Sequence, residues 1–160
     1  MEEKVELGGE EMEIPVVAGR RRIGLVGCVK GKASSPRPAK DLYVSPLFKG
    51  RRAYVERTCD EWWILSALHG LVDPDNVVAP YDLAMGDLGR SDRRVWSEAV
   101  LCDIDQRIHP AAGDTFELHA GTDYRFFGLE DGLRTRGMIV TNPTEGLRMG
   151  GQLAFYVSHS

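Results

Sequence analysis

Apolar and polar positions along the chain follow two patterns, one typical of strands and one typical of helices, and segments of the two kinds alternate. Runs of four to seven apolar or alternating residues are typical of buried strands, and they cover residues 22–28, 62–65, 115–120 and 137–140. Segments with apolar residues three or four positions apart are typical of helices, and they cover residues 46–59, 92–108, 123–136 and 151–159. This order predicts an α/β fold: a three-layer sandwich with a mostly parallel four-stranded sheet and helices on both faces.

Serine, proline and glycine residues mark where several of these elements begin and end. Ser45 is the expected N-cap of the first helix, with Pro46 at the first helical position. Ser91 is the expected N-cap of the second helix. Glycines interrupt a helical pattern, and the third helix is expected to be broken at Gly128 and Gly132.

Length and composition indicate one globular domain at residues 20–160. Residues 1–19 are acidic and lack apolar periodicity, so we expect a disordered leader and no secretory signal. No stretch approaches the roughly 20 apolar residues of a membrane span. The three cysteines have no metal-ligand spacing and form no disulfide framework. We therefore expect a cytoplasmic protein without metal or cofactor.

The charge is distributed unevenly along the chain. A net charge of −4 argues against a general, charge-driven nucleic-acid binder. Residues 20–58 are nevertheless rich in arginine and lysine. This basic half is equally consistent with a phosphate-binding face and with a solvated surface balanced by the acidic leader.

The densest chemistry lies in residues 61–86, where a short apolar strand ends in polar and small residues. Ligands of open α/β sheets bind beyond the carboxyl ends of the strands, which is where Ser66 and His69 are expected. Gly70 allows the backbone to turn tightly there, and Tyr81 and Asp82 follow. Structural roles are also open: His69 as a surface residue, Tyr81 as a core aromatic, and Asp82 as a helix N-cap.

The first and third predicted strands end in comparable clusters. Cys28, Lys30 and Lys32 stand in a glycine- and lysine-rich loop of the kind that binds anions. This loop is neither a Walker A loop nor a dinucleotide fingerprint. The third strand ends in residues 119–124, and Arg51 lies on the apolar stripe of the first helix. That arginine is expected either to reach outward, the commoner arrangement, or to point toward the site.

Five segments together resemble a bacterial and phage family of domains of unknown function that is related to the YaaA peroxide-stress proteins. They are Gly27-Cys28-x-Lys30-x-Lys32, Leu42-Tyr43-x-Ser45-Pro46-Leu47-Phe48, Ile64-Leu65-Ser66-Ala67-x-His69-Gly70-Leu71, Pro80-Tyr81-Asp82 and Ala120-Gly121-x-x-Tyr124. More distantly, the cysteine-lysine loop and the Tyr-Asp segment are similar to a domain of archaeosine synthase. The fold of that domain resembles uracil-DNA glycosylase, so the resemblance implies a uracil-DNA-glycosylase-like architecture over residues 22–157.

The resemblance also implies a pocket for a nucleobase, a nucleotide or modified DNA, with N-glycosidase-like chemistry. The expected catalytic residues are Asp82, for a cationic sugar or for water, and Lys32 or His69, for the leaving base. Tyr81 or Tyr43 would stack on the base. The expected substrate-binding residues are Cys28, Lys30, Tyr43, Arg51, Ser66, Gly70, Tyr81, Gly121 and Tyr124.

Two other functions stay open from the sequence. One is a transferase that modifies a deazaguanine-type base, with a lysine or Cys28 handling the substrate. The other is a nucleotide- or nucleic-acid-binding module without catalysis, acting in stress response or phage defence. The oligomeric state is not predicted by any pattern in the chain.

Overall fold

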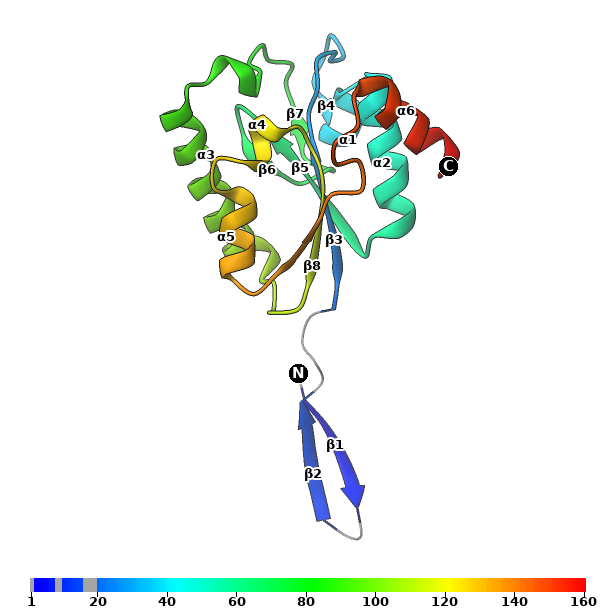
Figure 1. Cartoon of the computed structure of the whole chain (residues 1–160), viewed down its shortest axis with the longest axis vertical. Coiled ribbons are helices and arrows are strands. Elements are labelled where there is room, and N and C mark those ends of the chain that lie inside the picture. The colour runs from blue at the N-terminus through cyan, green and yellow to red at the C-terminus, as the bar shows by residue number, and fades with distance from the viewer. Residues whose placement is uncertain (1, 8–9, 16–19) are drawn as a thin grey trace.

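Figure 1 shows the computed structural model of the chain, which describes residues 2–7, 10–15 and 20–160. The strands of the main sheet are β3 (Arg22–Gly27), β5 (Glu61–Ser66), β6 (Gly70–Val72), β8 (Thr115–His119) and β9 (Ile139–Thr141). Their spatial order is β6-β5-β3-β8-β9. All neighbouring pairs are parallel except β5 and β6, which are antiparallel.

Helices cover both faces of this sheet (Figure 1). On one face lie α1 (Ala39–Leu42), α2 (Pro46–Thr58) and α6 (Met149–Ser158). On the other lie α3 (Arg90–Asp103), α4 (Thr122–Arg125) and α5 (Leu129–Thr135). The predicted α/β architecture, with a mostly parallel sheet between two helical layers, is confirmed.

The central strands are apolar on both faces because each face is covered. Successive side chains of a strand point to opposite faces. Leu25 accordingly packs in the cluster that contains Trp96 of α3, whereas its neighbour Val26 packs in the cluster that contains Phe48 and Val55 of α2. Burial of both faces of β3 explains why its sequence is a continuous apolar run.

The prediction of four strands is wrong by one, since β6 is a fifth strand at the edge of the sheet. Gly70 makes this possible, because its φ of +69° is a left-handed conformation that favours glycine. The chain reverses between Ser66 and Gly70, which are paired residues of β5 and β6. Leu71 and Val72 then return beside β5 and are buried.

The helix starts give mixed outcomes. Ser45 caps α2 as predicted, and its Oγ accepts a hydrogen bond of 3.1 Å from the Phe48 N–H. Ser91 is not a cap, because α3 already begins at Arg90 and Gly89 is the N-cap. Gly128, with a φ of +123°, separates α4 from α5 as expected. Gly132 instead lies inside α5, so the expected second break is wrong.

Two smaller two-stranded sheets complete the fold. β4 (Arg37–Pro38) pairs antiparallel with β7 (Val77–Val78). In the leader, β1 (Glu2–Leu7) pairs antiparallel with β2 (Glu10–Pro15), where the sequence predicts disorder. The rest of that predicted leader, residues 1, 8–9 and 16–19, lies outside the described residues. Among the described helices, none has the length and apolar character needed to cross a membrane.

Candidate functional site

The chain order creates a crevice at the carboxyl ends of β3 and β8. From β3 the chain passes through α2 to β5, whereas from β8 it passes through α4 and α5 to β9, in the opposite direction along the sheet. Ligands of open α/β sheets bind where the direction reverses in this way. The strand ends approach closely here, because a Cβ on Gly27 would lie 2.7 Å from the Ala120 Cβ.

Four hydroxyls and one thiol lie beside this crevice, and we call these residues, Cys28, Tyr43, Ser66, Tyr81 and Tyr124, the tyrosine cluster. The Tyr81 hydroxyl shares hydrogen bonds of 2.6 Å with the Tyr43 hydroxyl and 2.7 Å with the Ser66 Oγ. The Tyr124 hydroxyl donates to the Cys28 carbonyl at 3.3 Å. Residues from three strand ends therefore meet, as the sequence analysis expected for Cys28, Ser66 and Tyr124.

Backbone pairing between two loops brings Tyr81 to this position. β4 pairs with β7, and the Ala39 N–H donates to the Asn76 carbonyl at 2.7 Å. The segment after β7 is thereby held against the segment before α2. On the other side, Lys32 and Tyr43 form an isolated antiparallel bridge. Tyr81 and Lys32 thus approach Tyr43 from loops far apart in the sequence.

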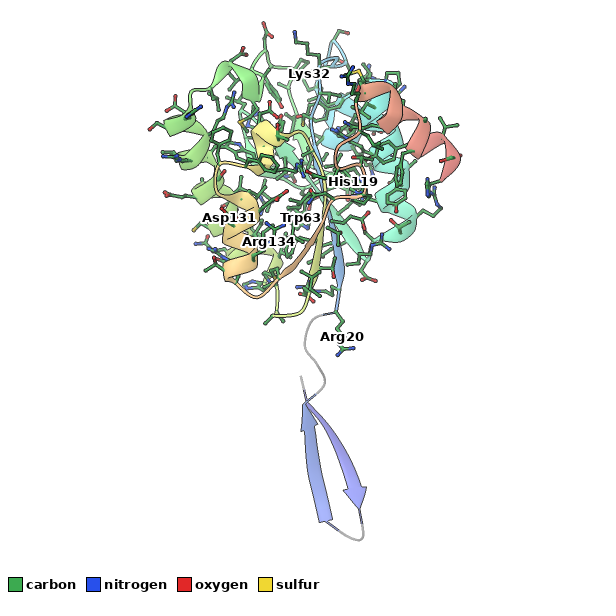
Figure 2. The ribbon with its side chains drawn as sticks, viewed as in Figure 1. Arg20, Lys32, Trp63, His119, Asp131 and Arg134 are labelled. Carbon is green, nitrogen blue, oxygen red and sulfur yellow. The ribbon has the colours of Figure 1, made fainter. Side chains whose placement is uncertain are left out.

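Lys32 and His69 lie at the solvent side of the tyrosine cluster. The Lys32 Nζ is 4.4 Å from the centroid of the Tyr81 ring, which is a cation–π arrangement. His69 meets the same ring edge-on, with 5.3 Å between centroids. Figure 2 shows Lys32 at the end of the domain where β3 and β5 finish. Among residues 20–160, no carboxylate lies within 4.0 Å of the Lys32 ammonium.

Burial raises the pKa values of the thiol and the phenols of the tyrosine cluster. It raises the pKa of the Cys28 thiol to about 12, although the Tyr43 and Tyr81 hydroxyls and the Lys32 and Arg51 cations act in the opposite direction. Burial likewise raises the pKa of Tyr81 to about 12. Thiolates are the nucleophilic form of cysteine, so this environment does not activate Cys28.

Arg51 is buried and points toward the crevice, which is the rarer of the two arrangements considered from the sequence. Its side chain belongs to α2 and is 3% exposed. Nη1 donates to the Gly27 carbonyl at 3.1 Å, and Nη2 donates to the Gln152 Oε1 at 3.0 Å. Burial lowers the pKa of this guanidinium. Arg51 thereby connects the end of β3 with the first turns of α6.

A pocket of about 390 Å³ opens beside Gln152, at the ends of β8 and β9, and we call it the switch-point pocket. Its polar side chains are two threonines, two amides, one arginine and one carboxylate: Thr122, Thr144, Asn142, Gln152, Arg125 and Glu145. The Arg125 guanidinium is neutralised by Glu130 at 3.0 Å and by Glu145. The Gln152 amide bonds to Arg51 and to the Leu147 carbonyl, and the Asn142 Oδ1 accepts from Arg125 at 2.6 Å. The two threonine hydroxyls and the Asn142 amide nitrogen are left, and they suit an uncharged ligand that forms hydrogen bonds.

Residues 23–158 match the model of a protein family described as a family of unknown function, DUF6884. The chain belongs to this family. A similar protein is the uncharacterized protein YfjM of Bacillus subtilis (strain 168), which is 32% identical over 101 residues, covering 55% of this chain and 67% of the relative. The predicted membership of a family of unknown function is confirmed, and the relationship to YaaA proteins and archaeosine synthase stays a prediction.

The remaining predicted residues of this DUF6884 domain lie at the margin of the site. Lys30 and Asp82 are exposed, and neither has a side-chain hydrogen bond or ion pair with residues 20–160. Asp82 directly follows Tyr81, so it lies next to the tyrosine cluster. Gly121 lines the switch-point pocket, and Gly70 forms the turn after β5. Tyr43 is 1% exposed, so its ring offers no face to a base, and its hydroxyl instead holds Tyr81.

Sequence reasoning did not identify a second buried polar group in this DUF6884 domain, which we call the ion chain: Arg22, Glu117, His119 and Tyr156. Glu117 accepts 2.6 and 2.7 Å hydrogen bonds from Arg22 Nε and His119 Nε2, and His119 Nδ1 lies 2.6 Å from the Tyr156 hydroxyl. Figure 2 shows His119 in the interior of the domain. The signal was present, because Glu117 and His119 lie two positions apart on one face of a strand.

Proposed function

We propose that this protein is an N-glycosidase-like enzyme that acts on a modified or damaged base in DNA or in a nucleotide. The observation that carries the proposal is the Lys32 ammonium, which lies over Tyr81 beside the ends of β3 and β5 without a carboxylate partner among residues 20–160. An unneutralised cation beside protonated hydroxyls suits an anionic group or a leaving base. We also propose, as part of the same hypothesis, that the fold is uracil-DNA-glycosylase-like and that the protein is related to YaaA proteins and archaeosine synthase.

The two parts of the site suit the two parts of a nucleoside. The base lies against Lys32, His69 and the accessible edge of Tyr81. The sugar enters the switch-point pocket, where Thr122 and Asn142 offer uncharged hydrogen-bonding groups. The first part adjoins the ends of β3 and β5, and the pocket adjoins the ends of β8 and β9, so the proposal requires a ligand that extends past the end of β3. A base within duplex DNA would have to be flipped out to enter.

The reaction needs only water as a second reactant. The bond between the sugar anomeric carbon and the base nitrogen breaks, and its electron pair leaves with the base. Lys32 stabilises the negative charge that develops on the base, while Asp82 stabilises the cationic sugar and accepts a proton from the attacking water. The water oxygen bonds to the anomeric carbon, and the base finally gains a proton.

The test is to incubate the protein with nucleosides, nucleotides and DNA that contains modified bases, and to detect released base by mass spectrometry. Asp82→Asn keeps the shape of the side chain but removes its charge. We expect it to lower turnover by about 100- to 1000-fold, or about 3–4 kcal/mol, while binding is retained. Asp92→Asn is the control, since Asp92 is also exposed but lies in the first turn of α3. Wild-type turnover in the Asp82→Asn protein would contradict the assigned role.

A binding module without catalysis is the second candidate, and one observation favours it. No side chain among residues 20–160 donates a hydrogen bond that would orient the Asp82 carboxylate. Binding of a nucleotide without release of base from any substrate would support this function. The transferase alternative now depends on Lys32, because the raised pKa of Cys28 leaves its sulfur as a thiol.

A further inference from the structure

Arg125 lines the switch-point pocket, and protein acceptors crowd one of its nitrogens while they leave the others unused. Its Nη1 meets three acceptors: the Glu130 carboxylate at 3.0 Å, the Asn142 Oδ1 at 2.6 Å and the Glu145 carboxylate. A guanidinium Nη has only two N–H groups, so one of these acceptors is surplus. Nε is buried and has no hydrogen-bond partner among residues 20–160, and Nη2 donates to no acceptor in the same range. Protein atoms therefore satisfy only one nitrogen of this guanidinium.

Of the three acceptors, Glu145 is the one that a ligand can replace. The Glu130 side chain is 9% exposed and also pairs with Arg134, so the fold holds it in place. The Glu145 side chain is 55% exposed and has no other hydrogen bond or ion pair with residues 20–160. It belongs to the exposed loop between β9 and α6 and itself lines the pocket. Its carboxylate can turn into solvent and give up only the contact with Arg125.

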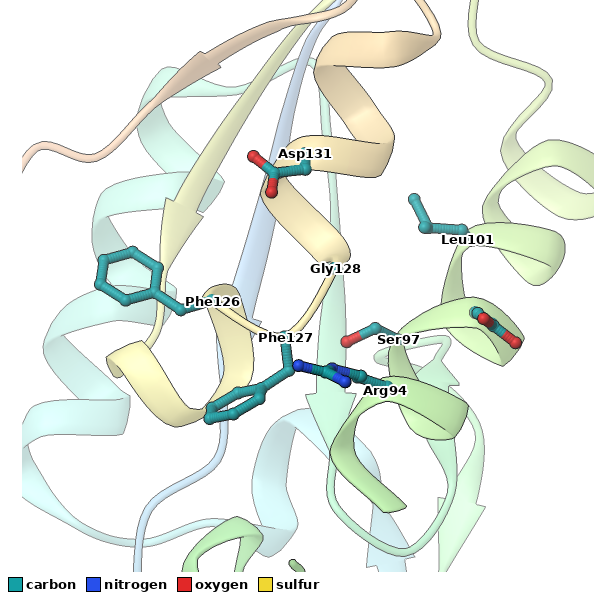
Figure 3. A pocket seen from close by; sticks show the side chains of 8 residues that line it. Arg94, Ser97, Leu101, Phe126, Phe127, Gly128 and Asp131 are labelled. Carbon is teal, nitrogen blue, oxygen red and sulfur yellow. The ribbon is translucent and has the colours of Figure 1, made fainter. Parts of the chain in front are cut away.

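One face of the Arg125 guanidinium is covered by Phe126. The centroid of the Phe126 ring lies 4.8 Å from the Arg125 Cζ, which is a cation–π arrangement. Figure 3 shows Phe126 in the turn between α4 and α5, pointing away from α3. The guanidinium is thus fixed by an aromatic ring and by Glu130, and a ligand reaches it from the switch-point pocket, where Glu145 lies.

We propose that the Glu145 carboxylate occupies the place of a ligand phosphate, so that the substrate is a nucleotide with a 5′-phosphate and not a free nucleoside. This inference rests on the proposed function, which puts the sugar in the switch-point pocket, since the phosphate is attached to that sugar. A phosphate that replaces Glu145 keeps an anion beside Arg125 and offers more acceptor oxygens to its free N–H groups.

Two uncharged groups of the switch-point pocket complete the phosphate site. The Thr122 hydroxyl and the Asn142 amide nitrogen have no hydrogen-bond partner among residues 20–160, and both can donate to phosphate oxygens. The pocket volume of about 390 Å³ is typical of a site for a small molecule. The net charge of −4 disfavours nucleic acid, so the phosphate monoester of a free nucleotide is the better match.

Isothermal titration calorimetry of the full chain with ribose 5-phosphate tests the proposal without any assumption about the base. The comparison ligands are ribose and the methyl ester of the same phosphate, which imitates the diester of a nucleic acid. We expect ribose 5-phosphate to bind about tenfold more tightly than either. Arg125→Lys keeps the charge but loses the planar fork, so it should weaken binding of ribose 5-phosphate about tenfold.

Glu145→Gln is the decisive variant, because damage to the fold cannot produce a gain of affinity. It removes the competing charge, so ribose 5-phosphate should bind roughly tenfold more tightly than to the wild type. Asp123→Asn is the matched control, since Asp123 is a nearby acid of α4 that does not line the pocket, and it should bind like the wild type.

Three results would overturn the phosphate site: equal affinity for ribose and ribose 5-phosphate, tighter binding of the methyl ester, or no gain of affinity in Glu145→Gln. These results are separate from a failure of the proposed function, because the titration requires no turnover. If Glu145→Gln binds ribose 5-phosphate more tightly but no nucleotide releases its base, the phosphate site stands and the glycosidase reaction is wrong. If base is released equally from nucleosides and nucleotides, the reaction stands and the phosphate site is wrong.

Discussion

The tyrosine cluster and the ion chain are two buried polar groups next to the same strand, β3, and they differ in how their charges are balanced. In the ion chain, Arg22 pairs with Glu117, a carboxylate that is 1% exposed. In the tyrosine cluster the buried groups are neutral, and the nearby cation, Lys32, has no carboxylate partner among residues 20–160. The ion chain thus pairs its cation with a protein carboxylate, whereas Lys32 beside the tyrosine cluster has no such partner among residues 20–160.

This difference separates a structural role from a binding role. Pairing and hydrogen bonding together offset the cost of burying a charge, and the ion chain meets both conditions with protein atoms. It joins β8 to α6, since His119 contacts Tyr156. The tyrosine cluster, in contrast, holds a cation at the opening of the crevice where an anionic ligand could pair with it. The comparison therefore predicts large stability effects in the ion chain and large binding effects in the tyrosine cluster.

The largest stability loss is expected for Glu117→Ala. It leaves Arg22 and His119 without their shared acceptor, and breaking a buried pair costs about 3–5 kcal/mol. We expect about 3 kcal/mol, because the Arg22 side chain is 42% exposed and regains water. Urea unfolding measures this loss. Glu61→Ala is the matched control, since the Arg21–Glu61 pair is 36% and 35% exposed and should contribute less than about 1 kcal/mol. Equal losses of unfolding free energy in Glu117→Ala and Glu61→Ala would show that the buried pair contributes no more than an exposed pair.

The ion chain also predicts a pH dependence of stability. Burial lowers the pKa of His119 below its ordinary 6.5, despite the attraction of Glu117. For Glu117, burial acts to raise the pKa, but hydrogen bonds from His119 and Arg22 outweigh it and lower the pKa below 4.5. In both cases the unfolded chain binds more protons than the native protein, so stability falls as pH falls.

The loss should begin near pH 6.5 through His119 and increase below pH 4.5 through Glu117. Urea midpoints measured from pH 8 to pH 4 show the slope. His119→Gln should flatten the upper part of this range, whereas His69→Gln, which replaces an exposed histidine, should not. Stability that rises on lowering the pH through 6.5 would mean that His119 is charged in the native protein.

Within the tyrosine cluster, Tyr81→Phe should have a smaller effect on stability. It removes two shared hydrogen bonds at 2.6 and 2.7 Å, and each bond contributes a net of about 0.5–1.5 kcal/mol. We expect a loss of about 1–2 kcal/mol in urea unfolding. Tyr54→Phe is the control, because the Tyr54 hydroxyl has no hydrogen-bond partner among residues 20–160. If Tyr81→Phe lost as much stability as Glu117→Ala, the tyrosine cluster would be as important for stability as the ion chain, and the predicted difference between them would be wrong.

Most of the fold could be predicted because the spacing of apolar residues follows from which side of each strand or helix is buried. The apolar runs of β3 and β5 and the Ser45 cap of α2 are local signals, and each is confirmed. β6 was missed because three residues are too few to show a period, and its strand conformation comes from pairing with β5. The prediction of Ser91 as the N-cap was wrong because the N-cap is Gly89, the residue before the helix start. A glycine has no side chain that could form the capping hydrogen bond by which an N-cap is recognised.

The site was only partly predictable, since the ends of parallel strands meet by topology whereas loop contacts do not. Topology alone brings Cys28, Ser66 and Tyr124 together. The pairing of β4 with β7, which carries Tyr81 to Tyr43, leaves no periodic signal in two-residue strands. Glu117 was overlooked because its strand alternates like one with a solvated face, whereas helices cover that face in the structure.

The smallest stability effect is expected for Lys32→Met, although its effect on binding should be the largest. Methionine keeps an unbranched apolar side chain but loses the cation–π contact with Tyr81. Such a contact at an exposed site contributes about 0.5–1 kcal/mol, so the free energy of unfolding should change by that amount. Affinity for a nucleoside monophosphate should fall at least tenfold, because a partly exposed cation without a carboxylate partner among residues 20–160 is removed. Calorimetric titration measures it, with Lys49→Met on the exposed side of α2 as the control. If Lys32→Met binds like the wild type but unfolds several kcal/mol more easily, Lys32 is a structural residue, and the contrast with the ion chain fails.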